Sequence, residues 1–247
     1  MRNSTSFTSA GFVLHRYPYK ETSYILETFT RSHGRVAMVA KGAKRNGTNK
    51  YALNAFQPII IDWFGRADLK TLKAADHDRI YPQLRGSALL AAFYVNELIL
   101  KLAAKDDAHE TLYDAYDRLI AALSHSCVTA REIEIHLRQF ELTMLAELGY
   151  ALTLDHEADS RAPIEASLDY WYVVDRGPVR HVRGHEIRAH EPILLSGQTL
   201  CALAEAHLDH TTPLQVLAQA KQLMRRVINH HLGDKALYTR QLMREMK

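Results

Sequence analysis

The sequence has 247 residues, of which 47% are hydrophobic and 24% are charged. These values exclude a disordered chain, and the length suits one large domain or two small ones. The two cysteines, Cys127 and Cys201, form no CxxC pair, which excludes a disulfide framework and a cysteine-based zinc site and favours the reducing cytoplasm. Residues 1–12 lack the apolar segment of a secretion signal, and the longest nearly apolar run, residues 88–95, is too short to span a membrane.

Charge is distributed unevenly along the chain, although the net charge is only +3. Residues 1–80 contain 13 Lys and Arg against 6 Asp and Glu, residues 81–220 contain 11 against 20, and residues 221–247 contain 7 against 2. A basic segment of this length is typical of a surface that binds a polyanion. Uneven charge is also common in cytoplasmic proteins, so the distribution alone leaves both interpretations open.

The first 80 residues predict β-strands. Runs rich in β-branched and aromatic residues occupy residues 12–17, 24–30, 35–41, 56–64 and 69–75. In the third run, Val36, Met38 and Ala40 share one face, and Arg35 and Lys41 share the other. Five short antiparallel strands are too few for a typical sandwich, and they fit a small closed barrel, for which the five-stranded OB-fold is the candidate.

From about residue 82 the hydrophobic period changes from two to 3.6, which predicts helices. Thr129 and Glu132 have the spacing of a capping box, and Gly149 is typical of the helix end that follows. The predicted helices run over about residues 86–102, 110–123, 129–149, 196–207, 213–232 and 237–246. Residues 170–174 and 179–182 flank a turn-forming Asp175-Arg176-Gly177-Pro178 and predict a hairpin.

We therefore predict an α+β chain of two domains. The first is an OB-fold β-barrel over residues 1–80, and the second is a mostly α-helical domain over residues 81–247 with an irregular or hairpin insertion at about residues 155–190. This division places most of the positive charge on the barrel and on the final helices.

The barrel segment carries the residues that we expect to contact nucleic acid. Lys and Arg neutralise phosphates and release condensed counterions, and aromatic rings stack on bases at roughly 1–3 kcal/mol per base. The predicted contacts are Arg35, Lys41, Lys44, Arg45, Lys50, Lys70 and Lys73, and the other basic residues of the segment include Arg16 and Lys20. The available rings are Tyr17, Tyr19, Tyr24, Tyr51 and Trp63, most of which we expect to fill the barrel core.

Arg138 is the candidate residue for a protein partner. It lies beside apolar positions of the predicted helix over residues 129–149, and an Arg at an apolar groove can receive the C-terminal carboxylate of a peptide. An ion pair with Glu134 or Glu141 inside the domain fits the sequence equally well.

Motifs of the common enzyme classes are absent from the sequence, which contains no phosphate-binding loop, no dinucleotide fingerprint and no G-x-S-x-G elbow. His185 and His190 resemble an HExxH motif but are one residue too far apart, so on a helix they would point about 140° away from each other. We expect no metal, no cofactor and no enzymatic activity. The alternative is a metal-dependent hydrolase that uses the histidines of residues 181–190.

Several short segments, taken in order, carry a family resemblance over essentially the whole chain. They are residues 12–15 (FVLH), 21–23 (ETS), 34–36 (GRV), 39–45 (VAKGAKR), 94–98 (YVNEL), 138–141 (RQFE), 148–150 (LGY) and 237–242 (LYTRQL). This ordered set is similar to the RecO family of bacterial DNA repair and recombination mediators. No single segment decides the resemblance, but the order of the set is specific.

The resemblance implies an N-terminal OB-fold, a helical C-terminal domain and a cytoplasmic, nucleoid-associated protein. It implies binding to single- and double-stranded DNA, annealing of complementary strands, and work with RecR to load RecA onto strands coated by single-strand-binding protein. It assigns contact with that protein's acidic C-terminal tail to the helical domain, which makes Arg138 a candidate there. The alternative is an interaction scaffold whose barrel binds a partner protein rather than DNA.

The chain departs from the family pattern at one place. Many members hold zinc with two CxxC pairs after the Leu-Gly-Tyr segment, but this sequence has no cysteine between Cys127 and Cys201 and reads Asp155-His156-Glu157-Ala158-Asp159 where the first pair would lie. We therefore expect no structural zinc.

Overall fold

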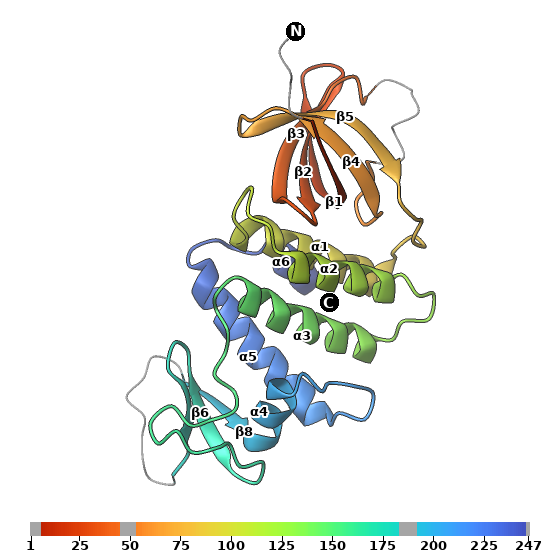
Figure 1. Cartoon of the computed structure of the whole chain (residues 1–247). Coiled ribbons are helices and arrows are strands. Elements are labelled where there is room, and N and C mark those ends of the chain that lie inside the picture. The colour runs from red at the N-terminus through yellow and green to blue at the C-terminus, as the bar shows by residue number, and fades with distance from the viewer. Residues whose placement is uncertain (1–5, 45–52, 183–191, 246–247) are drawn as a thin grey trace. The chain divides into compact units, whose positions relative to one another are not determined.

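The computed structural model describes residues 6–44, 53–182 and 192–245, and Figure 1 labels its helices and strands. The chain divides into two compact units: unit 1 comprises Met1–Val128 and Ala236–Lys247, and unit 2 comprises Thr129–Lys235. Unit 1 contains the barrel together with helices from both ends of the predicted helical domain. The compact units therefore do not follow the change from strands to helices near residue 80.

The five strands of unit 1 close into a barrel, which confirms the predicted OB-like fold (Figure 1). They are β1 (Ser6–Tyr19), β2 (Ser23–Thr30), β3 (Gly34–Ala40), β4 (Ile59–Phe64) and β5 (Leu69–His77). Their order around the barrel is β1-β2-β3-β5-β4, and β4 pairs with β1 to close it. The expectation of antiparallel pairing throughout is wrong for β3 and β5, which run parallel because the chain passes through β4 between them.

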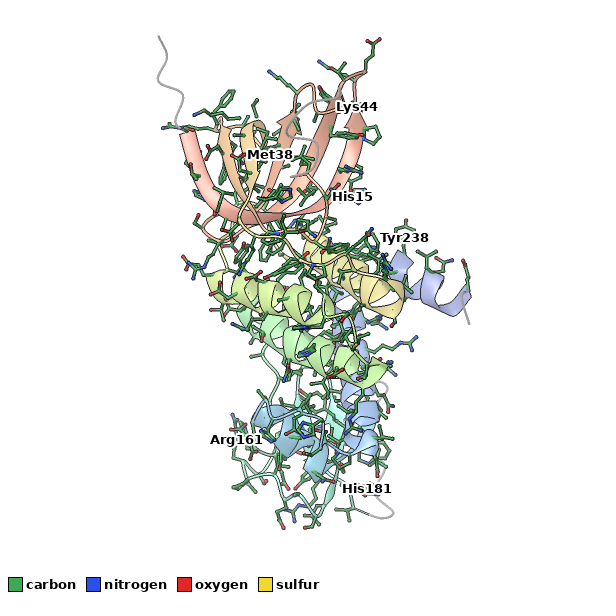
Figure 2. The ribbon with its side chains drawn as sticks, turned by 90° about the vertical axis from the view of Figure 1, so that its right-hand side faces the viewer. His15, Met38, Lys44, Arg161, His181 and Tyr238 are labelled. Carbon is green, nitrogen blue, oxygen red and sulfur yellow. The ribbon has the colours of Figure 1, made fainter. Side chains whose placement is uncertain are left out.

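The barrel interior is apolar because alternate residues of each strand point inward. Val36, Met38 and Ala40 lie there, as the alternation in β3 predicts, and Figure 2 shows Met38 inside the barrel. Trp63 of β4 is 1% exposed and fills part of the same core. The buried cluster consists of Val13, Leu26, Val36, Met38, Ala40, Leu53, Ile59, Ile61, Trp63 and Ala75.

The other face of β3 is also buried, which the alternation did not predict. Arg35 is only 9% exposed, and the segment that follows α1 (Gly86–Leu102) lies along it. The backbone N–H of Asp106 in that segment donates to the carbonyl oxygen of Arg35, with an N···O distance of 2.8 Å. Gly34 permits this approach, since its φ is +62° and a Cβ there would lie 1.7 Å from the carbonyl oxygen of Asp107.

Three helices complete unit 1: α1, α2 (Glu110–Leu123) and α6 (Tyr238–Glu245). A buried polar link joins α1 and α2 to the barrel, because the amide nitrogen of Asn96 in α1 donates to the carbonyl oxygen of Leu14 in β1 at 2.9 Å. The Tyr116 hydroxyl of α2 donates to the amide oxygen of the same Asn96 at 2.6 Å. The link holds α1 and α2 in a fixed register against β1.

Unit 2 is mostly helical and carries a small antiparallel sheet. Its elements are α3 (Ala130–Glu147), β6 (Asp169–Val173), β7 (Gly177–Arg180), β8 (Ile193–Ser196), α4 (Gly197–Ala204) and α5 (Leu214–Leu232). The capping box of Thr129 and Glu132 and the predicted hairpin of β6 and β7 are both confirmed. β8 was not predicted from the sequence; it is a third strand that pairs with the other side of β6.

Candidate nucleic-acid interface

The seven barrel cations that the sequence analysis selected fall into three groups. Arg45 and Lys50 lie outside the described residues. Arg35 and Lys70 are buried, whereas Lys41 and Lys73 are exposed and Lys44 is half-buried. The structure therefore does not bring the set together on one surface.

Arg35 and Lys70 are neutralised by carboxylates. The Arg35 guanidinium donates to the carbonyl oxygens of Leu100 and Ala103 at 2.7 and 2.8 Å and to the Glu27 carboxylate at 3.2 Å. The Lys70 ammonium lies 2.6 and 2.7 Å from the two carboxylate oxygens of Asp106. We name Arg35, Glu27, Lys70 and Asp106 the barrel base.

The barrel base joins the barrel to the end of α1 and to the segment after it. Arg35 satisfies carbonyl groups that the end of α1 leaves without helical partners, a role that needs a fixed and buried guanidinium. Two of the selected cations therefore serve the fold, and we leave them out of the interface that we propose below.

Lys41 and Lys44 lie in the turn after β3, at the opposite end of that strand from Arg35. Figure 2 shows Lys44 at the end of the barrel remote from α1 and α2. The Lys44 backbone N–H donates to the carbonyl oxygen of Thr22 at 2.9 Å, and its ammonium donates to the carbonyl oxygen of Lys20 at 2.7 Å. The turn after β3 is thereby fixed to the turn between β1 and β2.

Tyrosine rings hold the cations at this end of the barrel. Tyr24 packs against the barrel core, and the Arg16 guanidinium carbon and the Lys44 ammonium each lie 5.5 Å from its ring centroid. The Lys20 ammonium lies 5.4 Å from the ring centroid of Tyr19. A cation over an aromatic face is attracted to the ring but keeps its full charge and its N–H donors.

We name this surface the barrel rim, and its members are Arg16, Lys20, Lys41, Lys44, Tyr17, Tyr19 and Tyr24. Within the described residues, none of its four cations forms a salt bridge, although Glu21 is exposed in the same turn as Lys20. The rim therefore gathers several cations and the exposed ring of Tyr17 at one end of the barrel, and sites that bind single-stranded nucleic acid combine cations with aromatic rings in this way.

Arg16, Lys20 and the tyrosines were not among the site residues predicted from the sequence. The signal that would have found them is strand pairing. Tyr19 pairs with Ser23 across a tight turn, and this register continues through Pro18 with Tyr24 and Arg16 with Leu26. A hairpin drawn with this register brings Arg16 next to Tyr24.

Lys73 extends the rim along a neighbouring strand. Val39 of β3 and Thr71 of β5 are the last pair of their parallel ladder, and Lys41 and Lys73 each follow two residues later. Because the strands run in the same direction, both lysines lie beyond the same end of that ladder. Both side chains are exposed.

Arg138 lies on α3 in unit 2 and is buried, with a side chain 5% exposed. Its Nε lies 2.7 Å from one carboxylate oxygen of Glu141, and a terminal nitrogen donates to the other at 2.8 Å. A second terminal nitrogen lies 3.5 Å from the carboxylate of Glu134, which also binds the ammonium of Lys221 at 2.5 Å. The alternative of an ion pair inside the domain is therefore confirmed, while the partner role of Arg138 stays a prediction.

The described part of the chain contains no group of three or more His, Cys, Asp or Glu side chains placed to hold a metal ion. His185 and His190 of the alternative hydrolase site lie outside the described residues. His181 is described, and its ring packs edge-on against Trp171 with centroids 5.4 Å apart. Among the described helices, none has the length and apolar composition needed to cross a membrane.

Comparison with known proteins covers nearly the whole chain. A family model described as Recombination protein O N terminal matches residues 1–81, and one described as Recombination protein O C terminal matches residues 83–241. A DNA repair protein RecO of Thiobacillus denitrificans is 45% identical over 244 residues, which cover 96% of this chain and 91% of the relative. A DNA repair protein RecO of Nitrosospira multiformis is 43% identical over 238 residues, which cover 96% of this chain and 94% of the relative.

Proposed function

The chain belongs to the RecO family of DNA repair proteins and so has a role in DNA repair and recombination, and we propose that it performs this role by binding single- and double-stranded DNA at the barrel rim. The proposed action is non-enzymatic. The protein brings complementary strands together, and with RecR it helps to load RecA onto strands coated by single-strand-binding protein.

One observation supports the rim as the DNA site: aromatic rings hold rim cations in position without neutralising their charge. Arg16 and Lys44 rest on the ring of Tyr24, and Lys20 rests on that of Tyr19. A phosphate that approaches the rim finds free N–H donors and displaces no carboxylate. At the barrel base the same phosphate would compete with Glu27 and Asp106.

Annealing follows from this electrostatic arrangement. Two polynucleotide backbones repel each other, and cations that neutralise phosphates on both strands lower that repulsion. No bond is made or broken, so the rim needs only a dense set of positive charges. An interaction scaffold whose barrel binds a protein would not accelerate the pairing of naked complementary strands.

Removing the three ring-held cations tests the placement. We expect Arg16→Gln, Lys20→Gln and Lys44→Gln together to weaken binding to DNA of any sequence. The log–log dependence of single-strand affinity on salt should become less steep by about 2, since each neutralised phosphate contributes a slope of about −0.7. Affinity titrations at several salt concentrations, on single- and double-stranded oligonucleotides, give both quantities.

The matched control removes three exposed cations from elsewhere, with Arg85→Gln, Arg118→Gln and Arg225→Gln. This control changes the net charge by the same amount, so it measures the effect of overall charge alone. If the control flattens the salt dependence as much as the rim variant does, DNA is attracted diffusely and the rim is not the site.

For the helical domain, we propose that Arg138 receives a carboxylate from the tail of single-strand-binding protein. The contact with Glu134 at 3.5 Å is longer than the contact with Glu141 at 2.7 Å, so an incoming carboxylate would replace Glu134 while Glu141 keeps the guanidinium in place. Annealing of strands coated with intact single-strand-binding protein should be slower for Arg138→Ala than for the parent. When the coating protein lacks its last residues, the parent and Arg138→Ala should anneal strands at the same rate. If the parent is still faster than Arg138→Ala, the contact with the tail is contradicted.

A further inference from the structure

Three aromatic rings follow one another along the last part of β1, at His15, Tyr17 and Tyr19. Side chains alternate along a strand, so these three share one face and Arg16 points to the other. His15 is exposed, Tyr17 is 47% exposed and Tyr19 is half-buried. The ring centroids of His15 and Tyr17 lie 4.4 Å apart at an interplanar angle of 57°. We name these three rings the β1 ring row.

The β1 ring row does not serve the barrel core. Trp63 fills the core and Tyr24 packs against it, as expected for rings in this segment, but none of the three rings of the row belongs to that cluster. Tyr51 lies outside the described residues. The expectation that most of these rings fill the core is therefore wrong for Tyr17, which holds its ring at the surface next to a second exposed ring.

The row lies beside cations that would hold a polynucleotide backbone. The Lys20 ammonium lies over the ring of Tyr19, at the end of the row. The backbone carbonyl oxygen of Lys20 accepts a hydrogen bond from the Lys44 ammonium. A backbone bound by Lys20 and Lys44 carries bases within reach of the row. The cations fit a polyanion, and the exposed rings beside them fit a flat aromatic group attached to it, which together describe a polynucleotide.

We propose that the β1 ring row is the surface on which unpaired bases stack, and that it makes the rim prefer single-stranded over double-stranded DNA. This inference rests on the proposed function, because the rim must first bind the backbone. Paired bases inside a duplex are already stacked on their neighbours and offer no free face to a tyrosine. The cations therefore bind either form of DNA, and the rings distinguish between the two.

Substitution of Tyr17 tests the row. We expect Tyr17→Ala to lower affinity for single-stranded oligonucleotides by about 5- to 150-fold, the range that corresponds to loss of one stacked base, and to change duplex affinity by less than about twofold. Tyr17→Phe should bind as the parent does, because the ring face is kept. Tyr17→Leu keeps apolar bulk without a π face and should resemble the alanine variant.

Two controls separate stacking from a general effect. Tyr238→Ala removes an exposed tyrosine that also lies under a lysine, since Lys101 is 4.9 Å from its ring centroid, but on α6 rather than on the rim. It should leave both affinities unchanged. Thermal unfolding of each variant shows that it is folded.

A fluorescent base analogue in the oligonucleotide gives a readout that does not depend on affinity. Stacking of the analogue on Tyr17 should quench its emission at saturating protein, and Tyr17→Ala should abolish the quenching. Equal losses of single-strand and duplex affinity, or no loss with unchanged quenching, would overturn the ring row while DNA binding itself stands. Failure of the parent protein to bind either form of DNA would instead overturn the proposed function.

Discussion

At the barrel base, Arg35 and Lys70 lie buried against Glu27 and Asp106, whereas at the barrel rim Arg16 and Lys44 lie over the ring of Tyr24. Both ends of the barrel are rich in cations, and both fix those cations in place. The two ends differ in the group that holds the cations, which is a carboxylate at the base and an aromatic ring at the rim. A carboxylate cancels the charge that it orients, and an aromatic ring does not.

This difference separates charge that serves folding from charge that is available to a ligand. The two terminal nitrogens of Arg35 donate to Leu100, Ala103 and Glu27, so the contribution of this side chain is to stability. The rim cations repel one another in the absence of a polyanion, and among the described residues only one of their side-chain donors, that of Lys44, is used, on the carbonyl oxygen of Lys20. A count of basic residues in this domain therefore overstates the positive charge that DNA can use.

The largest effect that we expect on stability comes from the barrel base. Arg35→Met leaves the Glu27 carboxylate without its main partner and two carbonyl oxygens without a donor. Breaking a buried ion pair from one side costs about 3–5 kcal/mol in the free energy of unfolding. Lys105 lies 3.6 Å from Glu27, but its side chain is 49% exposed and cannot replace the buried guanidinium. Chemical denaturation measures the loss.

Lys41→Met is the matched control, because Lys41 directly follows the same strand and is exposed. We expect it to change stability by less than about 0.5 kcal/mol and to weaken DNA binding. Arg35→Met should do the reverse, with lower stability and unchanged DNA affinity of the folded protein. Weaker DNA binding by folded Arg35→Met would show that the base and the rim are not separate in function.

Much of the fold was predictable from the sequence because local signals were strong. The capping box at Thr129, the helix cap at Ser196 and the turn at Asp175 each fix an element through neighbours in the chain. The parallel pairing of β3 with β5 was not predictable in this way, since it depends on where a distant strand returns. The strand β8 was missed because four residues are too few to show alternation.

The candidate site was less predictable for a physical reason. Arg35 and Lys41 are separated by an even number of residues in the predicted strand over residues 35–41, so alternation gives them the same face and the same expected exposure. Their difference comes from the segment after α1, some seventy residues further along the chain, which buries Arg35 and leaves Lys41 free of it. Likewise, the contact of Arg16 with Tyr24 depends on the register that the turn between β1 and β2 sets, in which Tyr19 pairs with Ser23.

The smallest effect that we expect is a pH dependence of the helix-facing end of the barrel. Arg31 follows β2 and binds Asp114 of α2, with Nε 3.0 Å from the carboxylate. This hydrogen bond lowers the pKa of Asp114 below its ordinary value of 3.8. A carboxylate whose pKa is lower in the folded state stabilises the fold above the unfolded pKa, and this contribution is lost as the pH falls through the folded pKa.

Asp114→Asn should therefore lower Tm slightly at pH 7 and have no effect well below pH 3.8, where the parent has lost the same interaction. The pair is exposed, so the difference at pH 7 should be much smaller than that of Arg35→Met. Thermal unfolding of both proteins from pH 7 to pH 3 gives the two curves, which should converge on acidification. DNA affinity at pH 7 should be the same for both proteins, because no carboxylate neutralises the rim cations within the described residues. A loss of affinity in Asp114→Asn would mean that the helix-facing end of the barrel controls the rim, and the separation between the two ends would then have to be abandoned.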